Sequence, residues 1–553
     1  MAGDHEQVTG EQVIKPARHS GSLPRAGGWI VLALLSTVVG AAIWGLLTSA
    51  AGPATSSGID AYTQRIIGFT LLQAGFSTVL ALVAAIPLAR ALARRTDFPG
   101  RTWLLRFMAL PLGLPPIVAA LGLIAFWGQQ GLVNRLLAGT VIAEPISIYG
   151  LSGILLAHVF FNMPMAARLM IAELERLPAE YWRNAAQFGL SSRRIFTLIE
   201  APALLRVLPG IASLVFMLCA TSFTLVLLLG GGPAATTIEV AIYQALRFDY
   251  DPPRAVTLAF IQIALTSLLV LALRLLPHAD EGTGGGAEIR RFDGSAAASR
   301  LADTFVIVAG AAFLLMPLWG VVAAGLTPDL FPLMSDPRTW QALLTSLIVA
   351  GTAAAVSLLL AGAAIAARYA AGGGALRADR VLVASLGGAT SLILLVPPVV
   401  LGAGWFVLLS GHVDVFRIAP LVVIAVNALM ALPFVMRVLE PAYRTHRLRT
   451  DRLALSLGIS GPARLSRIDL PALAPAILAA LSFAMALSLG DLGAIALFGS
   501  QDFVTLPALL YQRMGSYRTA EAAGLALILA TLCLALMIAG TRTGTTATRG
   551  LAR

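Results

Sequence analysis

The sequence contains a single lysine, Lys15, among its 553 residues. A nucleotide-binding P-loop requires Gly-Lys-Ser or Gly-Lys-Thr, because its lysine reaches the phosphates of the bound nucleotide. No such segment exists in this chain. If ATP drives the activity of this protein, another polypeptide must therefore bind the nucleotide.

Cysteine is almost as rare as lysine. The two cysteines, Cys219 and Cys533, both lie inside apolar runs, so the sequence indicates neither a disulfide framework nor a metal cluster. Of the six histidines only His158 falls inside an apolar run, where we expect a hydrogen-bonded interior side chain. We therefore expect no metal site in this chain.

Charge is also scarce. Charged residues make up 12% of the chain, whereas ordinary soluble domains contain about 25%. Hydrophobic residues make up 58%, and the mean hydropathy is +0.83. The apolar runs are about 20 residues long and do not alternate with polar residues, which is typical of membrane-spanning helices and not of a β-barrel. The sequence predicts an all-α polytopic membrane protein.

Twelve apolar runs are long enough to cross a bilayer, and a Gly-rich stretch divides them into two halves of six. The predicted spans are 29–50, 66–89, 107–128, 147–171, 207–230, 255–276, 302–325, 342–367, 381–410, 418–436, 473–498 and 520–540. The predicted domains are an N-terminal tail (1–28), a first half (29–276), a linker (277–301), a second half (302–540) and a C-terminal tail (541–553).

The positive charges are distributed unevenly between the two sides of the predicted membrane. Most of the 39 Lys and Arg residues lie on the side that carries both tails and the linker. By the positive-inside rule this side is cytoplasmic. The rule also explains the net charge of +11, so we do not infer nucleic-acid binding, for which no module is visible.

The two halves repeat one pattern. An arginine-rich island at 172–202 contains Gly189, Ile199 and Pro202, and a second island at 440–471 contains the same residue types 269 positions later: Gly458, Ile468 and Pro471. A further repeat relates 113–122 to 395–404, each with a Pro-Pro pair. An even number of spans in each half makes the two copies parallel repeats, as in some transporters.

Each island is expected to form a short helix on the cytoplasmic surface, around 183–189 and 452–458. The glycine would allow a tight turn after that helix. The proline would mark the start of the next span, where its missing N–H costs nothing. Such a helix can bind in a groove on a soluble partner, and the alternative interpretation is a simple amphipathic connector.

The Gly, Ile and Pro spacing resembles the EAA loop of bacterial ATP-binding-cassette importer permeases. The resemblance implies coupling helices that bind two copies of an ATPase. The residues that it assigns to coupling are Arg183, Ala185, Gly189, Ile199, Pro202, Arg452, Ala454, Gly458, Ile468 and Pro471. The sequence departs from the motif because Arg183 and Arg452 replace its leading Glu, and because Ala201 replaces the Leu before the first proline.

Longer segments resemble the permeases of thiamine importers, among them 157–169, 230–246, 488–499 and 506–518. In that family both permease halves are fused in one chain of the bacterial inner membrane. The resemblance implies a periplasmic binding protein that delivers thiamine or its phosphates, and a homodimeric ATPase that binds ATP and Mg²⁺. This chain would then be a permease without a cofactor of its own, and not an enzyme.

Two alternatives remain open at this point. Fused ferric-ion permeases share the same architecture, so the cargo rests on the local segments and not on the fold. A secondary transporter is the alternative of another class. Such carriers usually keep several ionisable groups near the middle of the membrane, whereas this sequence places one acid, Asp491, well inside a predicted span.

Four residues are candidates for the translocation path. Asp491 is one, and its counterpart in the first half is Ser222, so any site there would be asymmetric. An acid inside a span is a functional candidate, although a helix-packing or gate hydrogen bond is the alternative role. Tyr243 and Tyr511 are equivalent residues on predicted external loops, where they would line the path, contact the binding protein or anchor the chain at the interface.

Overall fold

The computed structural model describes residues 22–50, 60–137, 145, 147–275, 291–326, 330–372, 376–393 and 396–550. Three parts of the predicted tails and linker lie outside the described residues: 1–21, 277–290 and 551–553. The described residues form helices joined by turns, and no strand occurs among them.

The elements α1 to α12 belong to the first half, and α1 begins within the predicted N-terminal tail. Their bounds are α1 (Ser22–Ala50), α2 (Ala61–Arg94), α3 (Arg101–Phe107), η1 (Leu110–Gly113), α4 (Pro116–Trp127), α5 (Leu132–Leu137), α6 (Leu151–Glu175), α7 (Ala179–Gln187), α8 (Ser192–Ile195), η2 (Phe196–Glu200), α9 (Ala201–Ala220), α10 (Thr224–Leu229), η3 (Pro233–Ala235), α11 (Ile238–Arg247) and α12 (Pro252–Leu275).

The second half contains α13 to α23. Their bounds are α13 (Ala297–Gly325), α14 (Leu330–Ser335), α15 (Pro337–Ala371), α16 (Arg377–Ile393), α17 (Pro398–Leu409), α18 (Val415–Ser456), α19 (Gly461–Arg464), η4 (Leu465–Asp469), α20 (Leu470–Leu489), α21 (Gly493–Phe498), α22 (Leu506–Gly515) and α23 (Thr519–Gly550).

The twelve predicted runs are all recovered as helices. Eleven helical segments of the described chain are long and apolar enough to cross a membrane. The remaining run, 381–410, forms two helices, α16 and the short apolar α17. The predicted fold class, an all-helical membrane protein with about twelve spans in two repeats, is confirmed.

Four of the twelve runs are broken instead of continuous, and they are equivalent pairs. In the runs 107–128 and 381–410 the break falls at the repeated Pro-Pro pair, where the missing N–H groups and the proline rings interrupt the helix. In the other two runs, 207–230 and 473–498, the break falls between α9 and α10 and between α20 and α21. The breaks place non-helical backbone within runs that hydropathy alone predicts to be uniform.

The first helix of each half packs against the other half. α1 contacts α15, α16 and α17, and α13 contacts α2 and α4. Glycines at the ends of the repeated Pro-Pro segments allow this approach: a Cβ on Gly122 would lie 2.3 Å from the Pro317 carbonyl oxygen, and one on Gly404 would lie 2.4 Å from that of Ala42. Small residues at helix interfaces let the backbones come close, which strengthens packing within a membrane.

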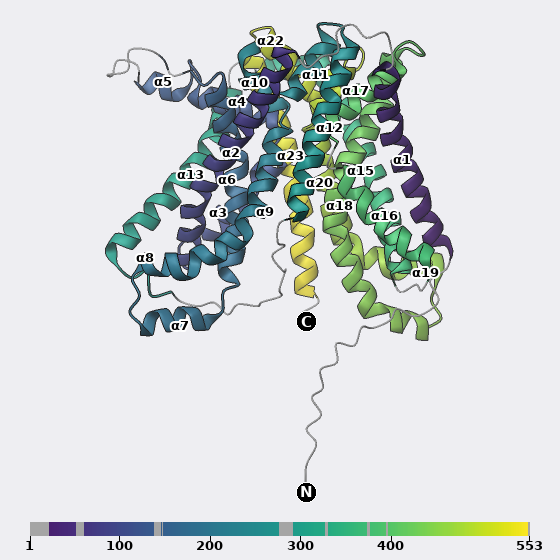
Figure 1. Cartoon of the computed structure of the whole chain (residues 1–553). Coiled ribbons are helices and arrows are strands. Elements are labelled where there is room, and N and C mark those ends of the chain that lie inside the picture. Colours follow the sequence, from purple (N-terminus) through teal and green to yellow (C-terminus); the bar gives the residue numbers. More distant parts are fainter. Residues whose placement is uncertain are drawn as a thin grey trace.

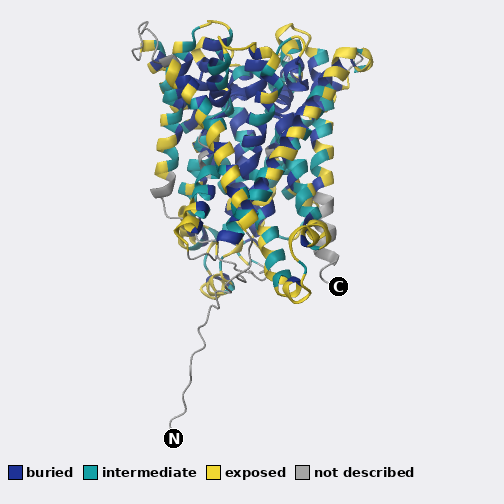
Figure 2. Ribbon diagram, turned by 90° about the vertical axis from the view of Figure 1, so that its right-hand side faces the viewer, coloured by how far each residue is buried: buried dark blue, intermediate teal, exposed yellow. Residues whose placement is uncertain are grey.

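The two ends of the bundle differ in how the halves meet. We call them the α7 end, which carries α7, α8 and α19, and the α11 end, which carries α11 and α22 (Figure 1). One hydrophobic core joins both halves through α4, α10, α11, α17, α21 and α22. Two other cores are separate from each other, the first built on α2, α6 and α9 with α13 of the other half, the second on α15, α18 and α20 with α1 of the other half. Buried residues are densest toward the α11 end (Figure 2).

Candidate functional site

The first island forms a separate short helix, α7. Pro178 lies just before α7 and separates it from α6. Proline has no N–H, so it cannot donate the backbone hydrogen bond that would continue α6. Gly189 follows α7 with φ +59°. The Leu190 N–H donates to the Ala185 carbonyl at 3.0 Å, and the Gly189 N–H donates to the Ala186 carbonyl at 3.1 Å. This is a Schellman C-cap, which requires a left-handed residue and favours glycine.

The second island ends in the same cap but does not form a separate helix. The Ile459 N–H donates to the Ala454 carbonyl at 2.9 Å, and Gly458 has φ +66°. However, α18 runs without a break from Val415 to Ser456. Arg447 stands where the first island has Pro178, so a backbone N–H is available to continue the helix at that point, and α18 also continues through Pro441. The prediction of a separate short helix around 452–458 is therefore wrong, and its residues form the last turns of α18.

Both islands present an uncovered surface at the α7 end. Arg183 and Arg452 are exposed, whereas Ala185 and Ala454 are buried against the chain. Large apolar side chains lie on the same exposed turns, including Phe188 at 78% exposure. The second island has the corresponding exposed residues Leu453, Leu455 and Leu457. An apolar surface flanked by arginines is typical of a site that binds another protein.

Ile199 and Ile468 are half-buried, and Ile199 packs against a small core formed by Trp182, Ala185 and Ile195. Each isoleucine lies in a π-helical turn, η2 or η4, in which a backbone N–H donates to a carbonyl five residues earlier.

A proline follows each π turn. Pro202 and Pro471 lie in the first turn of α9 and α20, as expected. Helical structure nevertheless begins earlier, at Ser192 and Gly461. The wider π turn accommodates a proline that would otherwise leave a helical carbonyl without its donor.

Two buried acids that the sequence interpretation missed stand near the C-terminal end of the islands, two residues before the proline of each. Glu200 and Asp469 occupy equivalent positions, at the same offset of 269 as the neighbouring isoleucines. Their exposures are 0% and 4%. That shared offset was the available signal, because a pair of acids at matching positions beside a repeated motif indicates a shared structural role.

Glu200 binds two arginines. The Arg90 Nε donates to Glu200 Oε2 at 2.5 Å, and the Arg291 guanidinium forms an ion pair with the other carboxylate oxygen. Arg90 also donates to the Ser192 carbonyl at 2.6 Å. These contacts join α2, the start of the α8–α9 helix and the linker, so the carboxylate fixes three parts of the chain at one point.

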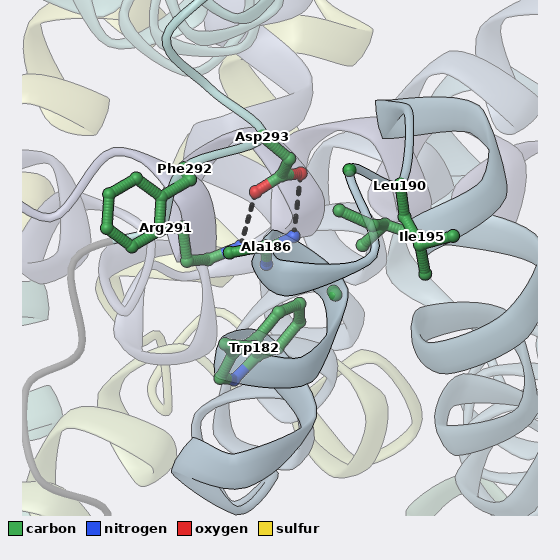
Figure 3. Close-up of a pocket in the computed structure, with 9 residues that line it drawn as sticks. Trp182, Ala186, Leu190, Ile195, Arg291, Phe292 and Asp293 are labelled. Carbon is green, nitrogen blue, oxygen red and sulfur yellow. Dashed lines mark hydrogen bonds and ion pairs between the residues drawn. The ribbon is translucent and has the colours of Figure 1, made fainter.

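The end of the linker covers the back of α7. The guanidinium carbon of Arg291 lies 3.9 Å from the centre of the Trp182 ring. Asp293 accepts hydrogen bonds from Arg291 at 3.1 Å and forms an ion pair with Arg94 at the same distance. A pocket of about 290 Å³ beside the first cap is lined by Trp182, Arg291 and Asp293 together with Ala186, Leu190, Ile195 and Phe292 (Figure 3). The linker is therefore part of the first island's structure.

The second island uses its own half instead of the linker. The Asp469 carboxylate lies 2.8 Å from His446 Nε2 and 3.4 Å from Arg464 Nε. Asp451 accepts from Arg464 at 2.5 Å and from the Tyr369 hydroxyl at 2.9 Å. The two islands thus share a backbone motif and a central acid but differ in the side chains that surround that acid.

Ser222 and Asp491 lie at the two equivalent helix breaks and are partly exposed. Asp491 was predicted to lie well inside a continuous span, and that prediction is wrong because α20 ends at Leu489. Its carboxylate caps α21: Oδ1 accepts from the Gly493 N–H at 3.1 Å and Oδ2 from the Ala494 N–H at 3.3 Å. The acid satisfies backbone donors that the break exposes.

The breaks of the two halves lie close to each other. A Cβ on Gly490, beside Asp491, would lie 3.1 Å from the Cα of Pro115 in the first half. Gly493 is close to Pro398, at the second Pro-Pro pair. The repeated Pro-Pro segments and the break at Asp491 therefore belong to one central region.

Tyr243 and Tyr511 lie on short helices, α11 and α22, and not on loops as predicted. The N-terminus of α11 is held by the Thr70 hydroxyl, which accepts from the Ile238 N–H at 3.1 Å. Ser346 holds the N-terminus of α22 in the same way, at 2.7 Å. The Tyr243 and Tyr511 phenols interact with each other, and burial raises the pKa of both. The tyrosines join the two halves at the α11 end.

Comparisons with known proteins agree with this architecture. The family model described as binding-protein-dependent transport system inner membrane component matches residues 77–279 and 363–542, one segment in each half. The chain is 49% identical over 524 residues to the thiamine transport system permease protein of Brucella abortus (strain 2308). The aligned residues cover 94% of this chain and 95% of that protein.

Proteins with the same description in two other bacteria are also similar. Identity is 43% over 480 residues with that of Escherichia coli (strain K12), covering 86% of this chain and 88% of the relative. It is 42% over 521 residues with that of Salmonella typhimurium (strain LT2), covering 93% and 96%. Such permeases act with a substrate-binding protein and an ATPase, and they are not enzymes. The chain belongs to the family of inner membrane components of binding-protein-dependent transport systems.

Proposed function

We propose that this chain carries thiamine, and its phosphates, across the bacterial inner membrane as the permease of an ATP-driven importer. The observation that carries the proposal is the similarity of 49% over almost the whole chain to a thiamine transport permease. The similarity extends over both halves and both islands. It favours thiamine over ferric ion as the cargo.

The α7 end faces the cytoplasm in this proposal. Arginines crowd that end, on the islands and on the loops beside them, in agreement with the positive-inside rule. α1 begins and α23 ends there, so both tails are cytoplasmic. The α11 end then faces the periplasm and receives the substrate-binding protein.

The two islands are the contact sites for a homodimeric ATPase, which supplies the site for ATP and Mg²⁺. Two identical subunits require two similar surfaces, and the islands provide the same Schellman cap with a buried alanine and an exposed arginine. A secondary transporter would leave this pair of uncovered apolar surfaces without a role.

The structure corresponds to the state that is closed to the periplasm. A single core joins the halves at the α11 end, whereas the cores toward the α7 end are separate. Binding of ATP would bring the two islands together and open the α11 end. The ATPase can drive this change only if it binds the two arrangements of the islands with different affinities.

The path passes the central region of helix breaks. Ser222 and Asp491 line it from the two halves, and Tyr243 and Tyr511 close it at the periplasmic end. Discontinuous helices frequently form the substrate site of transporters, because their ends offer backbone groups within the membrane.

Uptake of labelled thiamine tests the cargo in cells with and without the gene, when no second thiamine transporter is present. We expect deletion to abolish ATP-dependent thiamine uptake and to leave ferric-ion uptake unchanged. Unchanged thiamine uptake would refute the cargo, and iron would then be measured in the same cells.

Co-purification tests the ATPase contact. Proline cannot adopt the φ of +59° or +66° found at Gly189 and Gly458, so Gly189→Pro and Gly458→Pro should each reduce the amount of ATPase retained. Gly411, with φ +94° in the turn before α18 at the other end, provides the matched control. Equal retention by all three variants would exclude the islands as the contact site.

A further inference from the structure

One buried acid at the α11 end has no part in the arrangement described above. Glu239 lies in the first turn of α11 and is 1% exposed. Neither of its carboxylate oxygens has a hydrogen-bond partner among the described residues. Buried carboxyl groups are normally paired, because leaving one unpaired costs several kcal/mol. An unpaired acid that is retained in a membrane protein indicates a functional role.

The position of Glu239 on α11 directs it to the interface between the halves. It precedes Tyr243 by four residues, so the two side chains share one face of the helix. That face meets the second half, because α11 contacts α17 and α21 and Tyr243 contacts Tyr511. Glu239 therefore lies one turn below the tyrosine pair that joins the halves.

An aromatic ring from the first-half helix break packs against Tyr243. The Phe223 ring lies 5.5 Å from the Tyr243 ring in an edge-on arrangement, and Phe223 directly follows Ser222 at the helix break. A carboxylate together with aromatic rings is the combination that binds organic cations, through an ion pair and cation–π contacts. Among the residues that the structure describes, no basic side chain forms an ion pair with the acid: Arg247, the only one on α11, donates to the Gly499 carbonyl and lies over the Phe416 ring.

The repeat shows that this acid is a difference between the halves and not a part of the common fold. The offset of 268 that relates Tyr243 to Tyr511 places Pro507 at the position of Glu239. Pro507 serves as an N-terminal helix residue, so the fold does not require an acid at this point.

We propose that Glu239, with Tyr243 and Phe223, forms a binding site for an organic cation, which takes the positively charged ring of thiamine as it passes the periplasmic gate. This inference rests on the proposed function. In the closed gate the carboxyl is neutral, because no partner compensates its charge. Opening of the gate hydrates and ionises it, and the passing cation then becomes its partner.

Reconstituted transport tests this site with the permease, its ATPase and its binding protein together in lipid vesicles. The measured quantity is labelled thiamine taken up per ATP hydrolysed. Glu239→Gln keeps the shape and neutrality of the closed gate but cannot become charged, and we expect roughly a tenfold to hundredfold loss, the usual value of a charged hydrogen-bonded contact. Glu239→Asp keeps the charge and should retain at least a third of the wild-type ratio.

Asp249→Asn is the matched control, since it removes the same charge from an exposed residue just after α11. Wild-type transport by Glu239→Gln, or an equal loss in Asp249→Asn, would overturn the proposal. Equal losses in Glu239→Gln and Glu239→Asp would also overturn it, because they would show a requirement for shape and not for charge. Failure of the wild-type system to carry thiamine would refute the proposed function itself, and this inference with it.

Discussion

The buried carboxylate of Glu200 is the point at which the structure makes its sharpest energetic prediction. Glu200→Gln removes one charge from a site that is fully inaccessible to water. Breaking a buried ion pair costs about 3–5 kcal/mol, because the remaining charge stays buried. Arg291 keeps Asp293 at 3.1 Å and Arg90 keeps the Ser192 carbonyl at 2.6 Å, so we expect the lower value, about 3 kcal/mol.

This loss should appear as local opening of the first island and not as global unfolding. Hydrogen exchange measures such opening for each segment. A loss of about 3 kcal/mol should speed exchange in α7 and η2 on the order of 100-fold, since each 1.4 kcal/mol or so is tenfold. Peptides from the last turns of α18 should not change, because Asp469 has its own partners in the second half.

Glu175→Gln is the matched control. Glu175 pairs with Arg101 at 2.9 Å, close to the first island, but its side chain is 51% exposed. Exposed pairs contribute about 0–1 kcal/mol, so exchange should rise by about fivefold at most. If Glu200→Gln accelerated exchange no more than Glu175→Gln, the buried cluster would not be what holds the first island.

Three further predictions follow from the islands and the helix break. Gly189→Ala and Gly458→Ala should each destabilise the helix cap by about 1 kcal/mol, because the left-handed backbone is unfavourable for alanine although its Cβ would meet no atom within 4 Å. Both variants should weaken ATPase binding about equally in a titration, and unequal effects would contradict the shared cap. Asp491→Asn should keep thiamine uptake within about threefold of wild type, because Asn also caps helices, whereas Asp491→Ala should reduce uptake further. Abolished uptake in both variants would instead indicate that Asp491 contacts the substrate. Arg291→Met should accelerate hydrogen exchange in α7 by roughly tenfold or more, because a buried ion pair is lost, and should leave exchange in α18 unchanged. An equal acceleration in both helices would show that the linker does not stabilise the first island alone.

Hydropathy and the repeat predicted the spans, their number and the position of the islands, because these depend on local composition. The helix breaks were harder to predict from the sequence. Pro115 and Pro397 are visible in the sequence as helix-breaking residues, but Thr221–Phe223 contains neither Gly nor Pro. That break depends on tertiary packing, which a single sequence does not display. The prediction that Tyr243 lies on a loop was wrong for the same reason, since the short helix α11 is stabilised by contacts with its neighbours.

The packing of the first helix of each half against the other half could not be predicted either. Hydropathy gives the order of the spans along the chain but not their contacts. Gly122 and Gly404 were visible at equivalent positions, and their close approach to α13 and α1 becomes evident only from the packing. The family resemblance assigned the cap residues Ala185 and Ala454, yet it gave no reason for them. The reason is steric, because both alanines are buried where the cap closes.

The differences between the halves have a common physical consequence. A permease built from two identical chains would place every charged residue twice around the path, once in each half. Here the fused chain places an acid at Glu239, where the equivalent position of the second half is Pro507. In the proposed path a small cation with one fixed charge needs one counter-charge, and a second acid nearby would raise the electrostatic cost of the closed state. Fusion of the halves therefore lets the proposed path match an asymmetric cargo, while the islands keep the similarity that the proposed pair of identical ATPase subunits would require.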